Sequence, residues 1–257
     1  MSERNIGSDP RFTIFAVPHD GNILHDSRGL FCVPKETIRF YHNQMRDKHV
    51  QLLAPPMDDR EGKMVRFLYS RLMCDVERLE GPEEIMEKYG MGMWYEKAYD
   101  GTVINRRHNH RPEYYRFCQA YRREINDLCE KHRRVLLIDL HSYHDVIVPQ
   151  DFLVPGRKTP DLCIGTDDRF TPPGFVDVVR KRFEEIGLTV DVNYPYSGCY
   201  IPKSVADGSC SCDFIGLMLE FHRRAYMNGY GYGEDGPGGA GVIRETILKI
   251  IADSAAF

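Results

Sequence analysis

Strand-like apolar runs alternate along the chain with segments in which apolar residues recur every three or four positions. The runs are rich in β-branched, aromatic and leucine residues, and we expect strands at residues 11–17, 64–74, 135–140, 188–193 and 214–220. The periodic segments predict helices at residues 35–53, 112–134, 173–187 and 241–254. This alternation favours one α/β domain over residues 1–257, with a mixed or parallel sheet flanked by helices.

Polar residues capable of chemistry follow three of these expected strands. His19 comes after the first strand, His141 and Ser142 follow the continuous apolar run 135–140, and Glu220 ends the run that starts at residue 214. Ligands of open α/β sheets bind beyond the carboxyl ends of the strands. We therefore expect these side chains to meet at one edge of the sheet.

Composition excludes several classes of function. The 34 Lys and Arg residues against 38 Asp and Glu give a net charge of −4 without a basic block, so nucleic-acid binding has no electrostatic basis. No apolar stretch reaches the roughly 18–20 residues that span a bilayer, and the N-terminus lacks a signal-peptide pattern, so we expect a cytoplasmic protein. Its eight cysteines are dispersed and are expected to be reduced. The glycine-rich residues 229–241 are expected to form a surface loop.

The histidines raise the question of a metal site. A zinc hydrolase needs about three His, Asp or Glu ligands and one open position. The chain has no HExxH or CxxC motif, so the ligands would come from separate strand ends, with His19 and His141 as the candidates. Strand alternation places Asp139 on the same side as His141, where it could orient the imidazole. The alternative is that His141 only hydrogen-bonds at a polar strand end.

Glu220 is the candidate general base. A carboxylate at the end of a buried strand is unfavourable unless it is paired or functional, and burial or a metal can tune its pKa. The alternative is an ion pair with Arg223 or Arg224.

Arginines are the candidates for substrate binding, because guanidinium groups bind carboxylates in a bidentate manner. Four arginines fall near the same expected edge, namely Arg71, Arg78, Arg223 and Arg224. The alternative is that they only neutralise acidic neighbours such as Asp75 and Glu77.

Taken together, several segments resemble the N-formylglutamate amidohydrolase family, which is related to the zinc carboxypeptidases. The matching segments are residues 17–21 (VPHDG), 69–78 (YSRLMCDVER), 90–95 (GMGMWY), 137–142 (LIDLHS), 161–167 (DLCIGTD), 193–198 (NYPYSG) and 219–227 (LEFHRRAYM). The resemblance implies a zinc-carboxypeptidase-like α/β fold. It also implies hydrolysis of N-formyl-L-glutamate to L-glutamate and formate, as in histidine degradation.

The resemblance also implies a ligand set for one Zn²⁺ per chain. The first metal histidine of the family falls on His19 and the later one on His141, and the carboxylate ligand matches Asp47. Asn22 or Asp26 could supply that oxygen instead.

The family's general base corresponds to Glu220, and its carboxylate-binding positions correspond to Arg71 and Arg78. We expect Ser142 and Arg223 to be further substrate contacts. Glu77 stands where the family commonly has Asn. A carboxylate cannot donate a hydrogen bond to a substrate carboxylate, so the identity of the substrate stays open.

We therefore expect zinc to activate a water molecule whose proton passes to Glu220 and then to the departing amine. The alternatives are a deacylase or carboxypeptidase-like hydrolase of another N-acyl amino acid or peptide, and a non-catalytic protein that binds metal or carboxylates. The partner would be a small-molecule N-acyl amino acid. The sequence does not indicate an oligomeric state.

Overall fold

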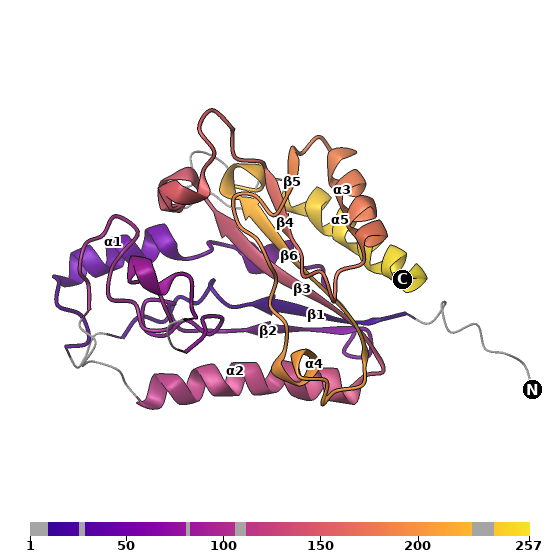
Figure 1. The fold of residues 1–257 in the computed structure, drawn as a ribbon, viewed down its shortest axis with the longest axis horizontal. Coiled ribbons are helices and arrows are strands. Elements are labelled where there is room, and N and C mark those ends of the chain that lie inside the picture. Colours follow the sequence, from indigo (N-terminus) through magenta and orange to yellow (C-terminus); the bar gives the residue numbers. More distant parts are fainter. Residues whose placement is uncertain (1–9, 26–28, 81–82, 106–111, 228–238) are drawn as a thin grey trace, which may run out of the picture.

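A six-stranded sheet forms the centre of the protein in the computed structural model (Figure 1), which describes residues 10–25, 29–80, 83–105, 112–227 and 239–257. The strands are β1 (Phe12–Val17), β2 (Gly62–Arg66), β3 (Arg134–Tyr143), β4 (Leu162–Gly165), β5 (Val190–Val192) and β6 (Asp213–His222). Their order across the sheet is β2-β1-β3-β6-β4-β5. The expected α/β fold with a mixed sheet is confirmed.

The four strands β2, β1, β3 and β6 run parallel, so their carboxyl ends share one edge. Strand β4 is antiparallel to β6, and β5 is parallel to β4. The two longest strands, β3 and β6, are paired over ten positions, and this register sets His141 directly beside Glu220. The sheet therefore places two of the candidate residues on adjacent strands.

Helices cover both faces of this sheet. They are α1 (Lys35–Met45), α2 (Pro112–Lys131), α3 (Pro173–Glu184), α4 (Lys203–Ala206) and α5 (Ala240–Asp253). Helices α2 and α4 lie along one face, and α3 and α5 lie along the other (Figure 1). Short 3₁₀ turns occur at Val50–Leu53, Glu87–Tyr89, Asp145–Ile147, Gln150–Phe152, Arg223–Ala225 and Ser254–Ala256.

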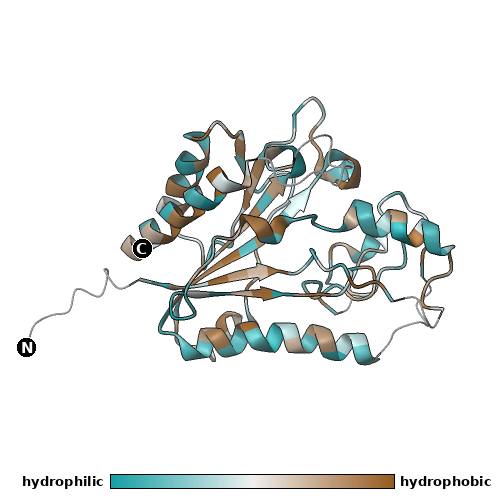
Figure 2. Cartoon of the chain, turned by 180° about the vertical axis from the view of Figure 1, so that it is seen from behind, coloured by the Kyte–Doolittle hydropathy of each residue, from teal (hydrophilic) through white to brown (hydrophobic). Residues whose placement is uncertain are grey.

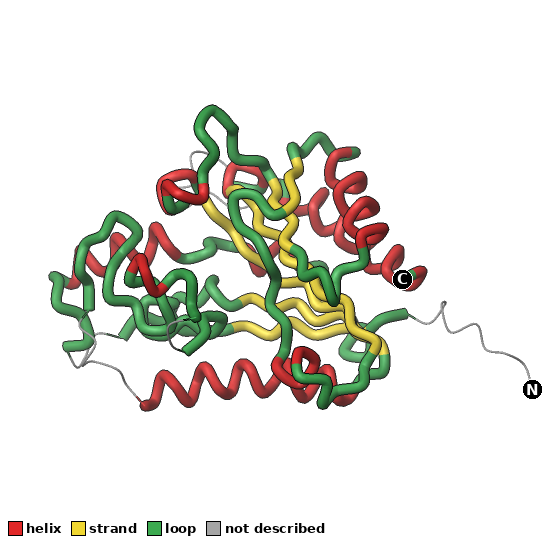
Figure 3. The backbone as a smooth tube through the Cα atoms, in the orientation of Figure 1, coloured by secondary structure: helices red, strands yellow, loops and turns green. Residues whose placement is uncertain are grey.

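Three apolar clusters follow from this layering. One joins the sheet to α3 and α5, and a second joins the opposite face to α2. Apolar residues are concentrated in the strands, whereas much of α2 is hydrophilic (Figure 2). The buried residues of α2 are Cys118, Tyr121, Ile125, Leu128 and Cys129. The third cluster packs α1 against the long segment that follows β2, and this loop-rich part of the molecule lies beyond the ends of β1 and β2 (Figure 3).

Several expected boundaries are wrong. The helix expected at 35–53 ends at Met45, because the backbone becomes extended at Arg46 and left-handed at His49, where φ is 62°. The strand expected at 64–74 ends at Arg66. Strand β4 has only four residues and was not expected at all. The expected glycine-rich loop falls mostly outside the described residues.

The cysteines also differ from expectation. Cys74, in the segment after β2, forms a disulfide with Cys118 of α2, whereas reduced thiols were expected throughout. Cys32, Cys129 and Cys163 are among the six that stay free. In the described part of the chain, no helix combines the length and the apolar character needed to cross a lipid bilayer.

Candidate active site

A cavity of about 640 Å³ opens at the carboxyl edge of the parallel strands. His19 reaches it from the segment after β1, His141 from β3 and Glu220 from β6, while Asp47 enters from the segment after α1. All four side chains are at least nine-tenths buried. The fold therefore brings together residues that are up to two hundred positions apart in the sequence.

Three of these residues form a compact set of metal-ligand types. The Nδ1 atoms of His19 and His141 are 3.2 Å apart. Asp47 Oδ2 lies 3.1 Å from His141 Nδ1 and 3.8 Å from His19 Nδ1. Two imidazoles and one carboxylate are the ligand types that catalytic zinc sites use. The three atoms lie close enough together to share one ion.

The opposite nitrogen of each imidazole faces a carboxylate. His19 Nε2 lies 2.8 Å from Asp75 Oδ1. His141 Nε2 lies 3.1 Å from Asp139 Oδ1, as strand alternation predicted, and 3.2 Å from Glu77 Oε1. A carboxylate at Nε2 favours the proton there and leaves the Nδ1 lone pair available to a metal. The donor set around His19, Asp47 and His141 therefore fits a divalent ion.

Two overlapping groups of possible ligands use the Nε2 atoms instead. They are His19, Asp75 and Glu77, and Glu77, Asp139 and His141. Each group contains a single imidazole, whereas His19, Asp47 and His141 contain two. Zinc prefers nitrogen-rich sites, so the chemistry of the donors favours the set that includes Asp47.

Of the two alternative oxygen ligands, the structure describes only Asn22. Its Oδ1 lies 3.1 Å from His42 Nε2. Asp26 lies outside the described residues. Asp47 is also held in place, because the Ser142 backbone N–H donates to its Oδ2 at 3.1 Å.

Asp75 connects the ligand region to the arginines. Besides His19, it accepts hydrogen bonds from Arg71 Nη2 at 2.9 Å and from the Tyr95 hydroxyl at 3.3 Å, and Arg78 Nε lies 3.6 Å away. Burial alone would raise the pKa of Asp75, but His19, Arg71 and Arg78 hold that pKa well below its usual range. Asp75 is therefore a buried anion shared by one candidate ligand and two guanidinium groups.

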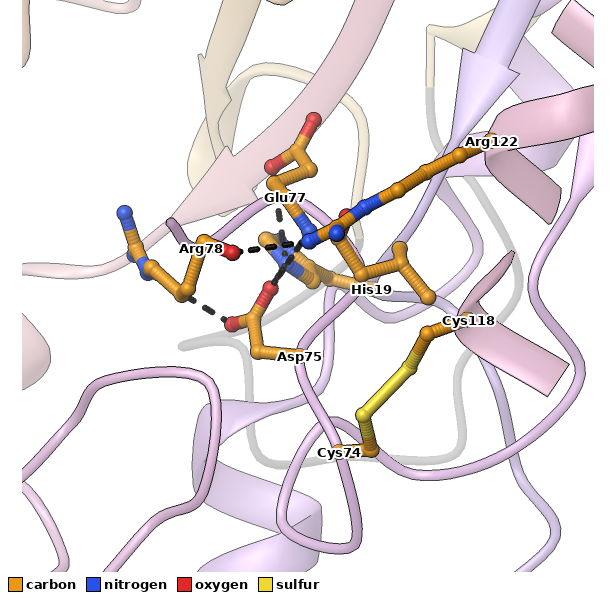
Figure 4. The surroundings of a disulfide bond; sticks show 8 residues. His19, Cys74, Asp75, Glu77, Arg78, Cys118 and Arg122 are labelled. Carbon is orange, nitrogen blue, oxygen red and sulfur yellow. Dashed lines mark hydrogen bonds and ion pairs between the residues drawn. A yellow bond between two sulfur atoms is a disulfide. The ribbon is translucent and has the colours of Figure 1, made fainter. Parts of the chain in front are cut away.

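Helix α2 fixes the segment that carries Asp75. Cys118 is bonded to Cys74, and Arg122, one turn further along the helix, donates from Nε to the Val76 carbonyl and from Nη2 to the Arg78 carbonyl, both at 2.7 Å (Figure 4). These two carbonyls flank Glu77. The direction in which Glu77 points is therefore set by α2.

Glu220 is 7% exposed and lines the same cavity. Burial raises the pKa of this carboxyl group to about 8. Arg224, one of its possible ion-pair partners, donates from Nε to Asp161 at 2.7 Å instead. The carboxyl group is thus placed beside the candidate ligands rather than in a surface ion pair.

The expected substrate contacts separate into two groups. Arg71, Arg78 and Ser142 line the cavity. Arg223 does not line the cavity in the described part of the chain. It is 1% exposed and donates from Nη2 to the Gln44 and Arg46 carbonyls at 2.8 and 2.5 Å. The structure places Arg223 behind the site, where it anchors the end of α1.

Sequence reasoning missed the connecting roles of Asp75, Tyr95 and Arg122. A signal for Asp75 was present, because it is a charged residue inside the apolar run 72–76. Such a residue is expected to be paired when it is buried. No comparable signal marks Arg122, whose partners are backbone carbonyls.

The raised pKa of Glu220 predicts a pH-dependent stability difference in metal-free protein. Glu220 has a pKa of about 8 in the folded protein and an ordinary pKa of about 4.3 in the unfolded chain. At pH values between these two, the unfolded chain has released a proton that the folded protein keeps. The contribution of Glu220 to stability is thus lost as the pH rises through this window. Glutamine stays neutral, so Glu220→Gln should become more stable than wild type by over about 1 kcal/mol at pH 8.

Urea unfolding with a chelator at several pH values between 5 and 8 measures this difference. Substitution of the exposed Glu245 by Gln is the matched control and should show no such trend. A constant offset between Glu220→Gln and wild type over the whole range would contradict the prediction.

Comparisons with known proteins agree with this architecture. The family model described as N-formylglutamate amidohydrolase matches residues 12–227. The crystal structure of N-formylglutamate amidohydrolase from Ralstonia eutropha JMP134 superposes with a TM-score of 0.74 at 20% identity, covering 96% of this chain and 94% of that one. The gene product Atu2144 from Agrobacterium tumefaciens gives a TM-score of 0.54 at 15% identity, with 98% and 92% covered. At these identities the two structures show a shared fold.

No curated protein matches the chain. The family model, however, spans most of the sequence and includes every candidate ligand and Glu220. The chain belongs to the N-formylglutamate amidohydrolase family.

Proposed function

We propose that this protein is a metal-dependent amidohydrolase that cleaves the N-acyl amide of an N-acyl amino acid, with one zinc ion per chain. The observation that carries the proposal is the convergence of His19 Nδ1, His141 Nδ1 and Asp47 Oδ2 in a cavity that Glu220 also lines. An amide hydrolase needs an electrophile for the carbonyl and a proton carrier beside it. This group of residues supplies positions for both.

Each residue has a defined task in this proposal. When bound by His19, Asp47 and His141, zinc supplies Lewis acidity to the amide carbonyl and acidifies water. Glu220 accepts the proton of the attacking water and delivers it to the departing amine nitrogen. Arg78, whose side chain lines the cavity and is 23% exposed, binds the substrate carboxylate.

N-Formyl-L-glutamate is the reference substrate. The family description and the name of the Ralstonia protein support it, and its hydrolysis would give L-glutamate and formate. This reaction would be consistent with a cytoplasmic role in histidine degradation, as the sequence resemblance implies.

Formate release from N-formyl-L-glutamate tests the reaction and its cofactor together. We expect activity in the zinc-loaded protein, its loss after chelation, and its recovery when zinc is restored. Formate is measured by a coupled dehydrogenase assay, with heat-denatured protein as the control. Full activity in protein shown by elemental analysis to be metal-free would contradict the metal requirement.

Two substitutions separate proton transfer from metal binding. Glu220→Gln keeps the three ligands, so it should retain zinc and lose about 10²–10⁴-fold in kcat. His141→Ala removes a ligand and should lose zinc itself. Elemental analysis and steady-state kinetics distinguish the two effects, and a Glu220→Gln enzyme of near wild-type turnover would exclude Glu220 as the base.

Arg122 is expected to act as a positioning residue. Arg122→Ala leaves the carbonyls of Val76 and Arg78 without their donor and loosens the segment that bears Glu77 and Arg78. A displacement on the order of 1 Å can cost about 10²-fold in rate, so kcat should fall by more than about tenfold.

Arg123→Ala, at an exposed position of the same helix, is the matched control. Arg122→Lys should recover part of the rate, because an ammonium group can reach one of the two carbonyls. An Arg122→Ala enzyme with unchanged kcat and KM would show that α2 does not position the site.

A further inference from the structure

Among the residues that the structure describes, the cavity offers a substrate few positive charges. The two arginines of this described lining, Arg71 and Arg78, are both engaged by acids of the protein. Arg71 donates to Asp75 at 2.9 Å and is 11% exposed. Arg78 lies 3.6 Å from Asp75 and 3.9 Å from Glu84, and it is 23% exposed. Arg78 is therefore the more accessible of the two, and it can take one carboxylate.

Carboxyl groups outnumber these arginines in the described lining of the cavity. They are Asp47, Glu77, Glu84 and Asp139, together with Glu220, whose pKa burial raises to about 8. A metal ion held by His19, Asp47 and His141 would offset part of this charge, but its chemistry would serve the scissile amide. A second substrate carboxylate would lose its hydration without gaining an unpaired cation from the described residues, which is unfavourable.

The rest of the lining combines hydroxyl-bearing side chains with apolar ones. The hydroxyl groups belong to Tyr95, Ser142, Tyr143, Tyr196, Ser197 and Tyr200. The buried or partly buried apolar side chains include Met45, Met86, Met91, Ile147 and Phe152. Leu79 and Ile85 also line the cavity and remain 57% and 65% exposed. Methionine side chains adapt to apolar groups of varied shape, and exposed apolar residues at a cavity often mark a binding site.

The size of the cavity points in the same direction. A volume of about 640 Å³ falls within the range of about 300–1,000 Å³ that holds drug-sized ligands. N-Formylglutamate is much smaller than such ligands. The cavity thus has room for a larger side chain next to the amide.

We propose that the substrate is a monoanionic N-acyl amino acid with an apolar side chain, whose α-carboxylate binds Arg78 and whose side chain lies against the methionine-rich wall. This inference rests on the proposed amide hydrolysis. The inferred substrate differs from N-formyl-L-glutamate in its amino acid, because glutamate would bring a second carboxylate into an acidic cavity.

A matched set of three substrates tests the inference. N-Formyl derivatives of L-glutamate, L-glutamine and L-methionine have side chains of similar length and differ mainly in charge and polarity. We expect kcat/KM to be highest for the methionine compound, intermediate for glutamine and at least about tenfold lower for glutamate than for methionine. Equal or faster cleavage of N-formyl-L-glutamate would overturn the inference and leave the amide hydrolysis intact.

A binding measurement distinguishes this failure from a failure of the proposed function. Calorimetric titration of zinc-loaded Glu220→Gln protein gives the Kd of each compound without turnover. Tighter binding of the methionine compound supports the inferred recognition even if no compound is cleaved by the wild type, an outcome that would contradict the hydrolysis. Tighter binding of the glutamate compound overturns the inference.

A charge placed at the cavity tests the physical cause. Leu79→Lys adds a cation at an exposed lining position, and Leu79→Gln is the neutral control. We expect Leu79→Lys to raise the ratio of kcat/KM for glutamate over glutamine by more than about threefold relative to the control. An unchanged ratio would show that the lack of an available cation does not set the preference.

Discussion

The site depends on the pairing of Asp75, a fully buried anion, with groups on both sides of it. One oxygen contacts the imidazole of His19, and the other receives Arg71. A buried charge is tolerated only where such partners surround it. The same carboxylate therefore orients a candidate metal ligand and holds a cavity guanidinium in place. Changing Asp75 would disturb metal binding and substrate binding together, even though it is not itself one of the preferred ligands.

The family assignment and the cavity bear on different questions. The shared fold and the group formed by His19, Asp47 and His141 support a reaction class, because they concern the amide and its electrophile. The proposed choice of amino acid depends on other groups of the cavity lining, among them Glu77 beside His141 and Glu84 beside Arg78. Specificity in such a pocket is the difference between the binding free energies of two substrates, which includes the cost of desolvating their charged groups and the gain from pairing them. A conserved reaction is compatible with a changed substrate for this reason.

The site residues that lie at the ends of strands could be predicted from the sequence. The apolar runs before His141 and Glu220 predicted two buried strands, and parallel pairing then fixed where their ends meet. Asp47 could be predicted only through the family resemblance. The role of Asp75 and the end of α1 at Met45 depend on tertiary contacts and on backbone conformations that periodicity does not encode. Strand β4 was missed because four residues give too little pattern.

The pairing of β3 with β6 has a consequence for how this scaffold can diversify. Neighbouring strands are held about 4.8 Å apart by their backbone hydrogen bonds, and His141 sits opposite Glu220 in that ladder. The spacing between the backbone positions of the candidate ligand and the candidate base is thus set by the pairing of the two longest strands. Substitutions, insertions or shifts in the surrounding segments leave the spacing between His141 and Glu220 unchanged. New substrates can be sampled by the loops while the reacting centre keeps its geometry.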